Sequence, residues 1–396
     1  MFKKLFSGEL FRGSFILISL IFLGNVLSYV FQFTMAWMLG PEDYSILATI
    51  TSIIAIFGIS TLSLQTIIAK RTTELRVQKK IGNIKWMFKF LAFKTFLFSL
   101  ISFGIFSLIS YLWLSKYLKI SFPLLILTGI FIFGAFLYPV AAGILQGTKK
   151  FKGLGFSFIV NGLFKLIVGS SLVFIGWKVY GAVLGFIVGI MMSFIVIFPF
   201  LRDIWVVEES EEKFELFSNT NLFTFFAIIL FILMYSLDVI FAKAFFSAQI
   251  SGEYAVISLL GKIILFLNMS IGNVMFPINS ERFICGKETK GIFNKSLLLV
   301  FLICGFSLLI FFLFPEFVVN TLFGEKYAAG EGILFYVGFA FSSISLLNIF
   351  VLNTISKNEF KFPQLGFLLI SLIIQIALLS LFHKTIIQFS IAFMVS

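Results

Sequence analysis

The sequence predicts an all-α polytopic membrane protein with about twelve transmembrane helices in two six-helix lobes around a central cavity. The first observation is composition: the 396 residues are 60% hydrophobic and only 12% charged, with a mean hydropathy of +1.09. Such a chain cannot cover a water-soluble globule with polar surface. The second is that apolar stretches long enough to cross a bilayer recur along almost the whole chain. The third is a repeat, described below, that relates the two halves.

Eleven apolar segments have the length of a membrane span: residues 14–39, 44–69, 87–113, 122–147, 153–176, 179–201, 221–246, 252–279, 293–318, 331–356 and 363–382. Residues 384–396 are apolar but too short to cross about 30 Å of hydrocarbon at about 1.5 Å per residue. We therefore expect a twelfth helix that is incomplete.

Lysine and arginine residues concentrate in alternate loops. The cation-rich segments are residues 3–12, 70–89, 149–152, 202–213, 282–295 and 357–361. The intervening loops carry far fewer cations. The positive-inside rule therefore predicts a protein of the cytoplasmic membrane whose N-terminus lies in the cytoplasm. The net charge of +12 is then explained by this topology and by attraction to anionic lipid.

One strongly acidic polar stretch separates the spans into two groups. We expect an interfacial N-terminal segment at residues 1–13 and an N-terminal lobe at 14–202. An acidic cytoplasmic linker at 203–220 then leads to a C-terminal lobe at 221–396.

The two groups of spans resemble each other. The Asp-Tyr pair at 43–44 returns as Glu-Tyr at 253–254, and Phe-Lys at 151–152 returns at 360–361, both at an offset of about 210 residues. Because six spans per repeat is an even number, both repeats have the same orientation in the membrane. They should therefore be related by an axis along the membrane normal and enclose a central cavity.

Three ionisable residues lie well inside predicted spans: Lys165, Asp238 and Lys262. A charge at the bilayer centre costs about 2.5 to 3.5 kcal/mol on insertion scales, so it persists where it faces a wet cavity or a partner. Asp238 and Lys262 lie on successive spans, and either neutralise each other or serve a substrate or coupling role. Lys165 has no acid in its own half, and Asn161 precedes it by one turn on the same helical face, so we expect this face to line an aqueous cavity.

A polar stripe runs along the first span. Asn25, Ser28 and Gln32 recur at spacings of three and four residues, which places them on one helical face. The repeat offset sets Ser28 against Asp238, and it sets Lys165 against Gln375. The stripe either contributes to the cavity or hydrogen-bonds a neighbouring helix.

Several classes of function are not expected. Two cysteines and one histidine are too few for a metal centre, and there is no phosphate-binding loop or nucleotide fingerprint. The predicted outer loops are too short to hold the acids or histidines of a membrane enzyme. We expect no metal, no cofactor, no enzymatic activity and no nucleic-acid partner.

Four stretches carry a family resemblance: LGPEDYSILATITS, QGTKKFKGLG, GWKVYGAVLGFIVG and SLDVIFAKAFFSAQISGEYAVISLLGK. They resemble the polysaccharide or oligosaccharide flippase branch of the multidrug and oligosaccharidyl-lipid/polysaccharide exporter superfamily. The resemblance implies two lobes with twelve to fourteen helices. It also implies that the protein moves a polyprenyl-diphosphate-linked oligosaccharide from the inner to the outer leaflet by alternating access, for cell-surface polysaccharide synthesis.

The resemblance also implies roles for residues and partners. Lys165 and Lys262 would meet the diphosphate, with Asp238 as a neighbouring acid. The expected partners are the lipid-linked glycan, membrane lipids, and a polysaccharide polymerase or glycosyltransferases. One alternative is a cation-coupled multidrug exporter of the same superfamily, in which Asp238 would be the proton or sodium site. Another is a membrane enzyme or scaffold of envelope synthesis.

Overall fold

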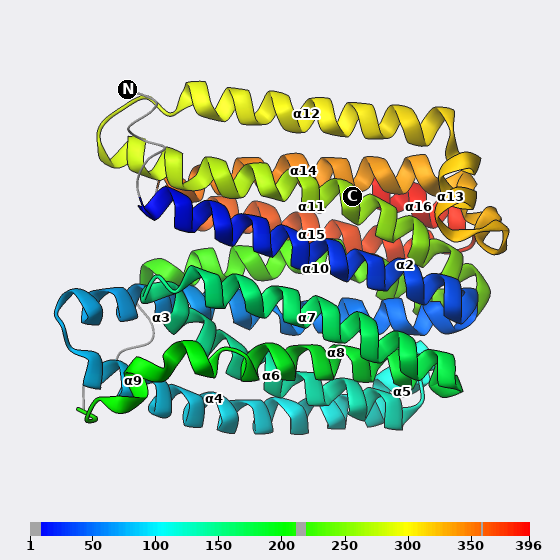
Figure 1. The fold of residues 1–396 in the computed structure, drawn as a ribbon. Helices are drawn as coiled ribbons and strands as arrows, with labels where there is room; N and C mark the ends of the chain where they lie inside the picture. The colour runs from blue at the N-terminus through cyan, green and yellow to red at the C-terminus, as the bar shows by residue number, and fades with distance from the viewer. Residues whose placement is uncertain (1–8, 211–218, 358) are drawn as a thin grey trace. The chain divides into compact units, whose positions relative to one another are not determined.

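The computed structural model describes residues 9–210, 219–357 and 359–396, which form helices joined by short turns (Figure 1). No strand occurs in these ranges. Most of the predicted interfacial segment 1–13 and part of the predicted linker 203–220 lie outside the described residues. The chain divides into two compact units, residues 1–39 with 57–216, and residues 40–56 with 217–396.

The first unit contains the helices of the first half of the chain. They are α2 (Glu9–Phe57) up to Leu39, α3 (Ile59–Val77), α4 (Ile81–Ile109), η1 (Ser110–Leu114), α5 (Ser115–Leu118), α6 (Phe122–Gly147), α7 (Phe151–Leu172), η2 (Val173–Trp177), α8 (Lys178–Ile195), η3 (Phe198–Leu201) and α9 (Arg202–Val206). An apolar core that includes Ile68, Met87 and Leu145 joins α3, α4 and α6. Because α4 also exposes large apolar side chains such as Ile101 and Leu108, its outer face suits contact with lipid.

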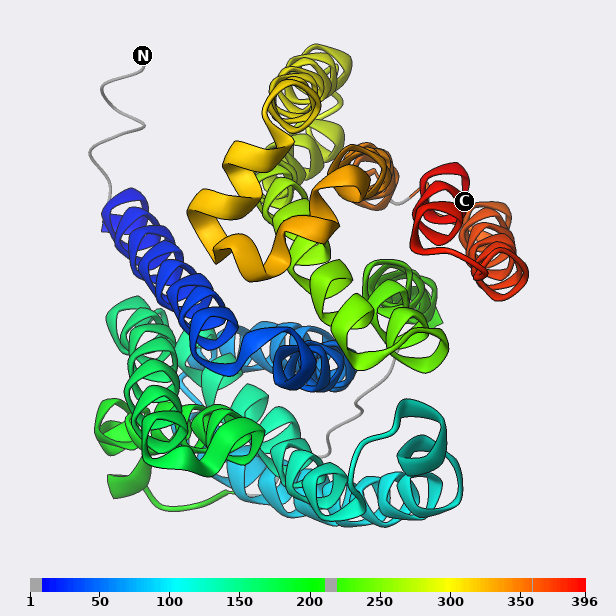
Figure 2. The ribbon, with the colours of Figure 1, turned by 90° about the vertical axis from the view of Figure 1, so that its right-hand side faces the viewer.

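The second unit contains the end of α2 and the helices of the second half. They are α10 (Asn219–Phe245), α11 (Ala248–Ile284), α12 (Lys290–Leu313), α13 (Pro315–Phe323), η4 (Glu325–Ile333), α14 (Leu334–Ser356), α15 (Phe362–Leu381) and α16 (Ile386–Val395). Figure 2 views these helices end on and shows the short α13 and η4, in yellow-orange, crossing the ends of longer ones. Residues 40–56, which the sequence analysis placed in the N-terminal lobe, group with this unit.

Gly40 marks the point at which α2 passes from one unit to the other. Its backbone has φ 75° and ψ 172°, which interrupts the helix and favours glycine, and Pro41 follows directly. Beyond it, the chain packs tightly inside the second unit. A Cβ atom on Gly252 would lie 2.0 Å from the carbonyl oxygen of Pro41, so no side chain fits there.

The structure confirms a multi-pass, all-helical membrane protein. Within the described residues, nine helices are long and apolar enough to span a bilayer. This number is below the predicted twelve partly because α2 carries the first predicted span and the first half of the second across Gly40. In addition, α7 and α8 are counted as one stretch, Phe151–Val206. The final helix α16 has 10 residues.

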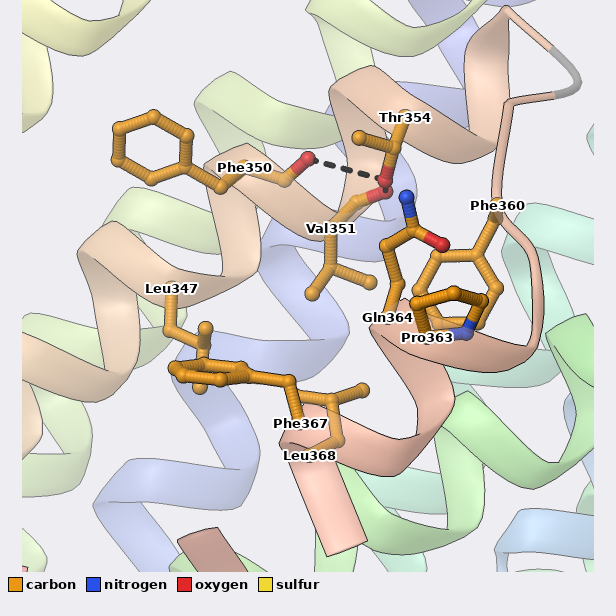
Figure 3. A pocket seen from close by; sticks show the side chains of 9 residues that line it. All are labelled: Leu347, Phe350, Val351, Thr354, Phe360, Pro363, Gln364, Phe367 and Leu368. Atoms are coloured by element: carbon orange, nitrogen blue, oxygen red, sulfur yellow. Dashed lines mark hydrogen bonds between the residues drawn. The ribbon is translucent and has the colours of Figure 1, made fainter. Parts of the chain in front are cut away.

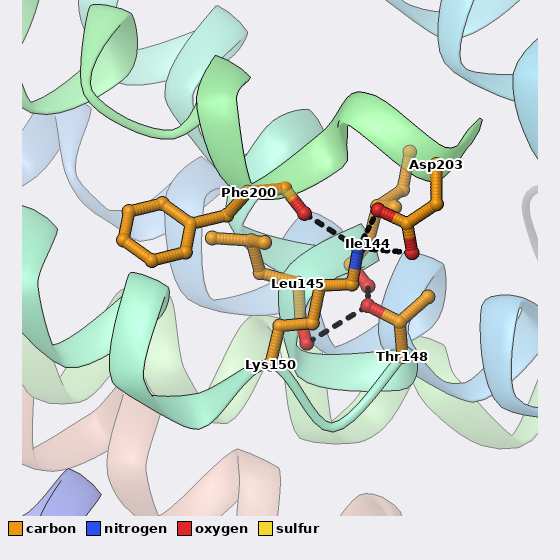
Figure 4. A network of polar contacts seen from close by, with 6 residues as sticks. All are labelled: Ile144, Leu145, Thr148, Lys150, Phe200 and Asp203. Carbon is orange, nitrogen blue, oxygen red and sulfur yellow. Dashed lines mark hydrogen bonds and ion pairs between the residues drawn. The ribbon is translucent and has the colours of Figure 1, made fainter. Parts of the chain in front are cut away.

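The start of the predicted linker is bound to the first unit. Lys85 Nζ donates hydrogen bonds of 2.9 Å to the carbonyl oxygens of Trp205 and Val207, and Lys89 forms an ion pair with Glu209. Figure 4 shows a further contact, in which Lys150 Nζ lies 2.5 Å from both the Phe200 carbonyl oxygen and Asp203 Oδ1. These contacts hold residues 203–209 against α4 and the turn before α7.

Removing one of these lysines is expected to loosen the segment. In Lys85→Met, two hydrogen bonds to a charged donor are lost, each about 1.5 to 3 kcal/mol, so amide hydrogen exchange at residues 204–209 should accelerate at least about tenfold. Hydrogen-exchange mass spectrometry of the purified protein measures this, with the exposed Lys70→Met on α3 as the control. Unchanged exchange would show that Lys85 does not hold the segment.

Candidate functional site

Lys165 is a buried cation in the middle of α7. Its side chain is 6% exposed, and its Nζ donates a hydrogen bond of 2.8 Å to Ser28 Oγ on α2. The ammonium group also lies over two aromatic rings, 5.4 Å from the centre of Phe31 and 4.9 Å from the centre of Phe186. These contacts bring together α2, α7 and α8 around one charge.

A glycine on α8 lies against the base of the Lys165 side chain. A Cβ atom on Gly189 would lie 2.8 Å from the Asn161 carbonyl oxygen and 3.2 Å from Lys165 Cβ. The backbones of α7 and α8 therefore approach closely beside the lysine, as small residues allow in membrane helices. The approach leaves little lateral freedom at the base of the lysine side chain.

The charge of Lys165 is not neutralised within its surroundings. Among the described residues, no carboxylate forms an ion pair with it, and its partners are a hydroxyl group and two aromatic faces. A hydroxyl dipole and ring quadrupoles stabilise a cation far less than a carboxylate does at this depth. The arrangement can therefore accept an anionic group supplied from outside the chain.

Asp238 and Lys262 meet in the second unit. Asp238 on α10 is fully buried, and its Oδ1 lies 3.5 Å from Lys262 Nζ on α11. Asp238 Oδ2 accepts hydrogen bonds from Ser258 Oγ at 2.5 Å and from the Tyr254 hydroxyl at 3.4 Å. Lys262 also lies 5.8 Å from the centre of the Phe341 ring. Of the two alternatives for this pair, mutual neutralisation is the one that this geometry favours.

The predicted polar stripe on the first span has mixed surroundings. Asn25 is exposed, Ser28 is half-buried and bonded to Lys165, and Gln32 is 9% exposed. Asn161 is half-buried, one turn from Lys165. These residues belong to the first unit, whereas Asp238 and Lys262 belong to the second. Ser28 thus contacts a buried charge directly.

The offset of about 210 residues between the two halves pairs a contact in the first unit with a contact in the second. In the first unit, Lys165 on α7 hydrogen-bonds Ser28 on α2. In the second, Gln375, the counterpart of Lys165, is buried on α15 and donates a hydrogen bond of 2.8 Å to the Met234 carbonyl oxygen on α10, one turn before Asp238. Both units therefore join their first and fifth long helices through a polar side chain at the same position. At this position the second unit has the amide of Gln375, whereas the first unit has the ammonium group of Lys165.

Lys243 is a buried cation that the sequence analysis missed. It lies near the end of the predicted span 221–246, but its side chain is only 3% exposed, and its Nζ donates a hydrogen bond of 2.7 Å to Ser45 Oγ. Ser45 Oγ itself donates to the Glu42 carbonyl oxygen at 2.6 Å. The signal was the run IFAKAFF, in which apolar residues surround the lysine on both sides.

Metal ligation is not evident in the described part of the chain, where no group of three or more His, Cys, Asp or Glu side chains comes together. Cys285 is exposed and Cys304 is buried, and both are free thiols. The buried lysines and Asp238 are therefore the ionisable groups on which a site can be built.

A family model for polysaccharide biosynthesis proteins matches residues 10–283, which is more than half of the sequence. The chain belongs to this family. Membership agrees with the resemblance found in the sequence, because the matched region runs from the first span to the end of α11. Curated proteins include none with significant sequence similarity to it.

Solved structures of transporters share the fold of this polysaccharide biosynthesis protein. One is "Lipid II flippase MurJ, inward closed conformation", with a TM-score of 0.68 and 13% identity over 96% of this chain and 84% of that one. Another is an inward-facing multidrug resistance MATE family transporter of the MOP superfamily, with a TM-score of 0.65 and 13% identity over 96% and 94%. A MOP superfamily transporter from Pyrococcus furiosus has a TM-score of 0.62 and 13% identity over 97% and 92%. At these identities the likeness shows the fold alone.

Proposed function

We propose that this protein is a flippase that moves a polyprenyl-diphosphate-linked oligosaccharide across the cytoplasmic membrane for cell-surface polysaccharide synthesis. It works by alternating access, with its N-terminus in the cytoplasm. Membership of the polysaccharide biosynthesis family and a fold shared with the lipid II flippase MurJ support the proposal. The asymmetry of lysine and arginine between alternate loops supports the orientation.

The observation that carries the proposal is Lys165. A buried ammonium group with a hydroxyl and two aromatic rings as its partners is suited to meet a diphosphate, since the anion would supply the charge that the surroundings lack. In this proposal Asn161, Asn25 and Gln32 give polar contacts along the same route. We assign Lys262 a smaller role than the family resemblance implies, because Asp238 Oδ1 lies 3.5 Å from its ammonium group.

Depletion of the protein tests the proposed function. The lipid-linked oligosaccharide should then accumulate in the inner leaflet, where it stays protected from a sugar-cleaving enzyme added outside intact cells. Restoring the protein should expose the sugar to that enzyme. Normal exposure of the oligosaccharide in depleted cells without a redundant paralogue would exclude the flippase.

The depleted cells also distinguish a flippase of lipid-linked sugars from a multidrug exporter. An exporter coupled to a cation gradient would extrude cationic dyes, and the extrusion would stop when the gradient is removed. A flippase of lipid-linked sugars leaves dye accumulation unchanged on depletion. We expect the second result, because Asp238, the residue that an ion-coupled exporter would use, is occupied by Lys262, Ser258 and Tyr254.

A further inference from the structure

A cavity of about 460 Å³ lies in the second unit, where α14 ends and α15 begins. Its lining residues are Leu347, Phe350, Val351, Thr354, Phe360, Pro363, Gln364, Phe367 and Leu368. In Figure 3, Leu347 and Phe367 lie toward one side of the cavity, and Phe360 with Pro363 lies toward the other. The volume falls within the range of about 300 to 1,000 Å³ that is usual for small-molecule sites.

Both polar side chains in the lining make a hydrogen bond to the backbone. Thr354 Oγ1 donates to the carbonyl oxygens of Val351 at 2.8 Å and Phe350 at 3.3 Å. Gln364 Oε1 accepts a hydrogen bond of 3.0 Å from the backbone N–H of Lys361. The remaining lining is hydrocarbon, so the cavity favours an apolar occupant over a sugar or a phosphate.

One wall of the cavity is fixed, and the mouth is open. Phe360 and Leu368 are 9% and 1% exposed and belong to an apolar core that includes Leu230 of α10. Phe367, in contrast, is 61% exposed, and Phe350 is 48% exposed. Exposed rings of this kind in a membrane protein suit contact with lipid, so this open side is where a hydrocarbon chain from the bilayer would enter the cavity.

The turn beside the cavity carries the charge that a lipid headgroup would meet. Lys357 ends α14, and Lys361 precedes α15 between two lining residues, Phe360 and Pro363. Glu359 is the one acid on the described part of this turn, so the cations outnumber it. Lysines at the end of a membrane span lie at the depth of lipid phosphates.

We propose that this cavity binds one acyl chain of an anionic phospholipid whose phosphate lies beside Lys361. The hydrocarbon fills the mainly apolar cavity, and the headgroup remains at the interface. A methylene group that moves from water into such a cavity contributes about 0.8 kcal/mol. A methylene group that moves from the bilayer into the cavity gains only better packing. The preference for one phospholipid over another therefore comes from the headgroup. The site is independent of the proposed flippase activity.

Lipid retained by the purified full-length protein tests the proposal. Native mass spectrometry after exchange into mixed phosphatidylglycerol and phosphatidylcholine should show at least about fivefold more phosphatidylglycerol bound to the wild type. Val351→Phe fills part of the cavity and should remove most of the bound lipid. Ile370→Phe, at a 58% exposed position on α15 outside the cavity, is the matched control and should retain it.

A second variant tests the role of the charge. Lys361 is exposed, so replacing it does not require the cavity to repack. Lys361→Glu should still bind lipid but lose the preference for phosphatidylglycerol over phosphatidylcholine, because the acyl-chain cavity is intact while the charge beside the headgroup is reversed. Equal lipid retention by Val351→Phe and wild type would overturn the proposal, as would an unchanged preference for phosphatidylglycerol in Lys361→Glu. Retention of polyprenyl phosphate with no phosphatidylglycerol would overturn the assignment to a phospholipid.

Discussion

Lys165→Met is expected to abolish export of the lipid-linked oligosaccharide while leaving the amount of protein in the membrane unchanged. Methionine has a similar length and no charge, so it can occupy the space between Phe31 and Phe186. Removing a charge from the bilayer interior also removes an insertion cost of about 2.5 to 3.5 kcal/mol, so assembly should not suffer. What is lost is the ammonium group that would meet the diphosphate.

The measurement combines surface glycan, detected on intact cells, with membrane level, detected by immunoblot. Lys94→Met is the matched control, because Lys94 is an exposed lysine on α4 whose ammonium lies 5.3 Å from the centre of the Phe90 ring. Ser28→Ala should reduce export less, since it removes one hydrogen bond and keeps the cation. Full export by Lys165→Met would remove this residue from the substrate site.

The arrangement of helices was largely predictable from the sequence. The predicted span 122–147 coincides with α6, and 363–382 closely matches α15, because a bilayer demands an apolar run of fixed length. The grouping of residues 40–56 with the second unit was not predictable. An apolar run shows that a segment avoids water, but it does not show which neighbouring helix the segment packs against.

The buried charges were predictable only in part. Lys165 stood out because it lies in the middle of a long apolar run, where no interface is within reach of its side chain. Phe31 and Phe186 did not stand out, because the chain has 58 phenylalanines and only the fold selects the two that face the lysine. Lys243 was missed because a lysine near the end of a span ordinarily extends to the interface.

Asp238→Asn is expected to lower stability strongly, and combining it with Lys262→Met is expected to restore most of the loss. The single change leaves Lys262 without its carboxylate, and breaking a buried pair from one side costs about 3 to 5 kcal/mol. The double variant removes both charges, and replacing a buried pair with neutral groups is often close to neutral. Thermal unfolding of the purified protein and membrane level in cells measure both effects.

The comparison of single and double variants separates a structural role from a coupling role. Asp203→Asn is the matched control, because its ion pair with Lys150 is largely exposed on the aspartate side and should contribute less than about 1 kcal/mol. Recovery of both stability and export in the double variant identifies Asp238 as the counter-ion of Lys262. Recovery of stability without export would instead give Asp238 a direct part in transport. A double variant as unstable as Asp238→Asn would show that Ser258 and Tyr254, the other partners of the carboxylate, depend on it more than Lys262 does.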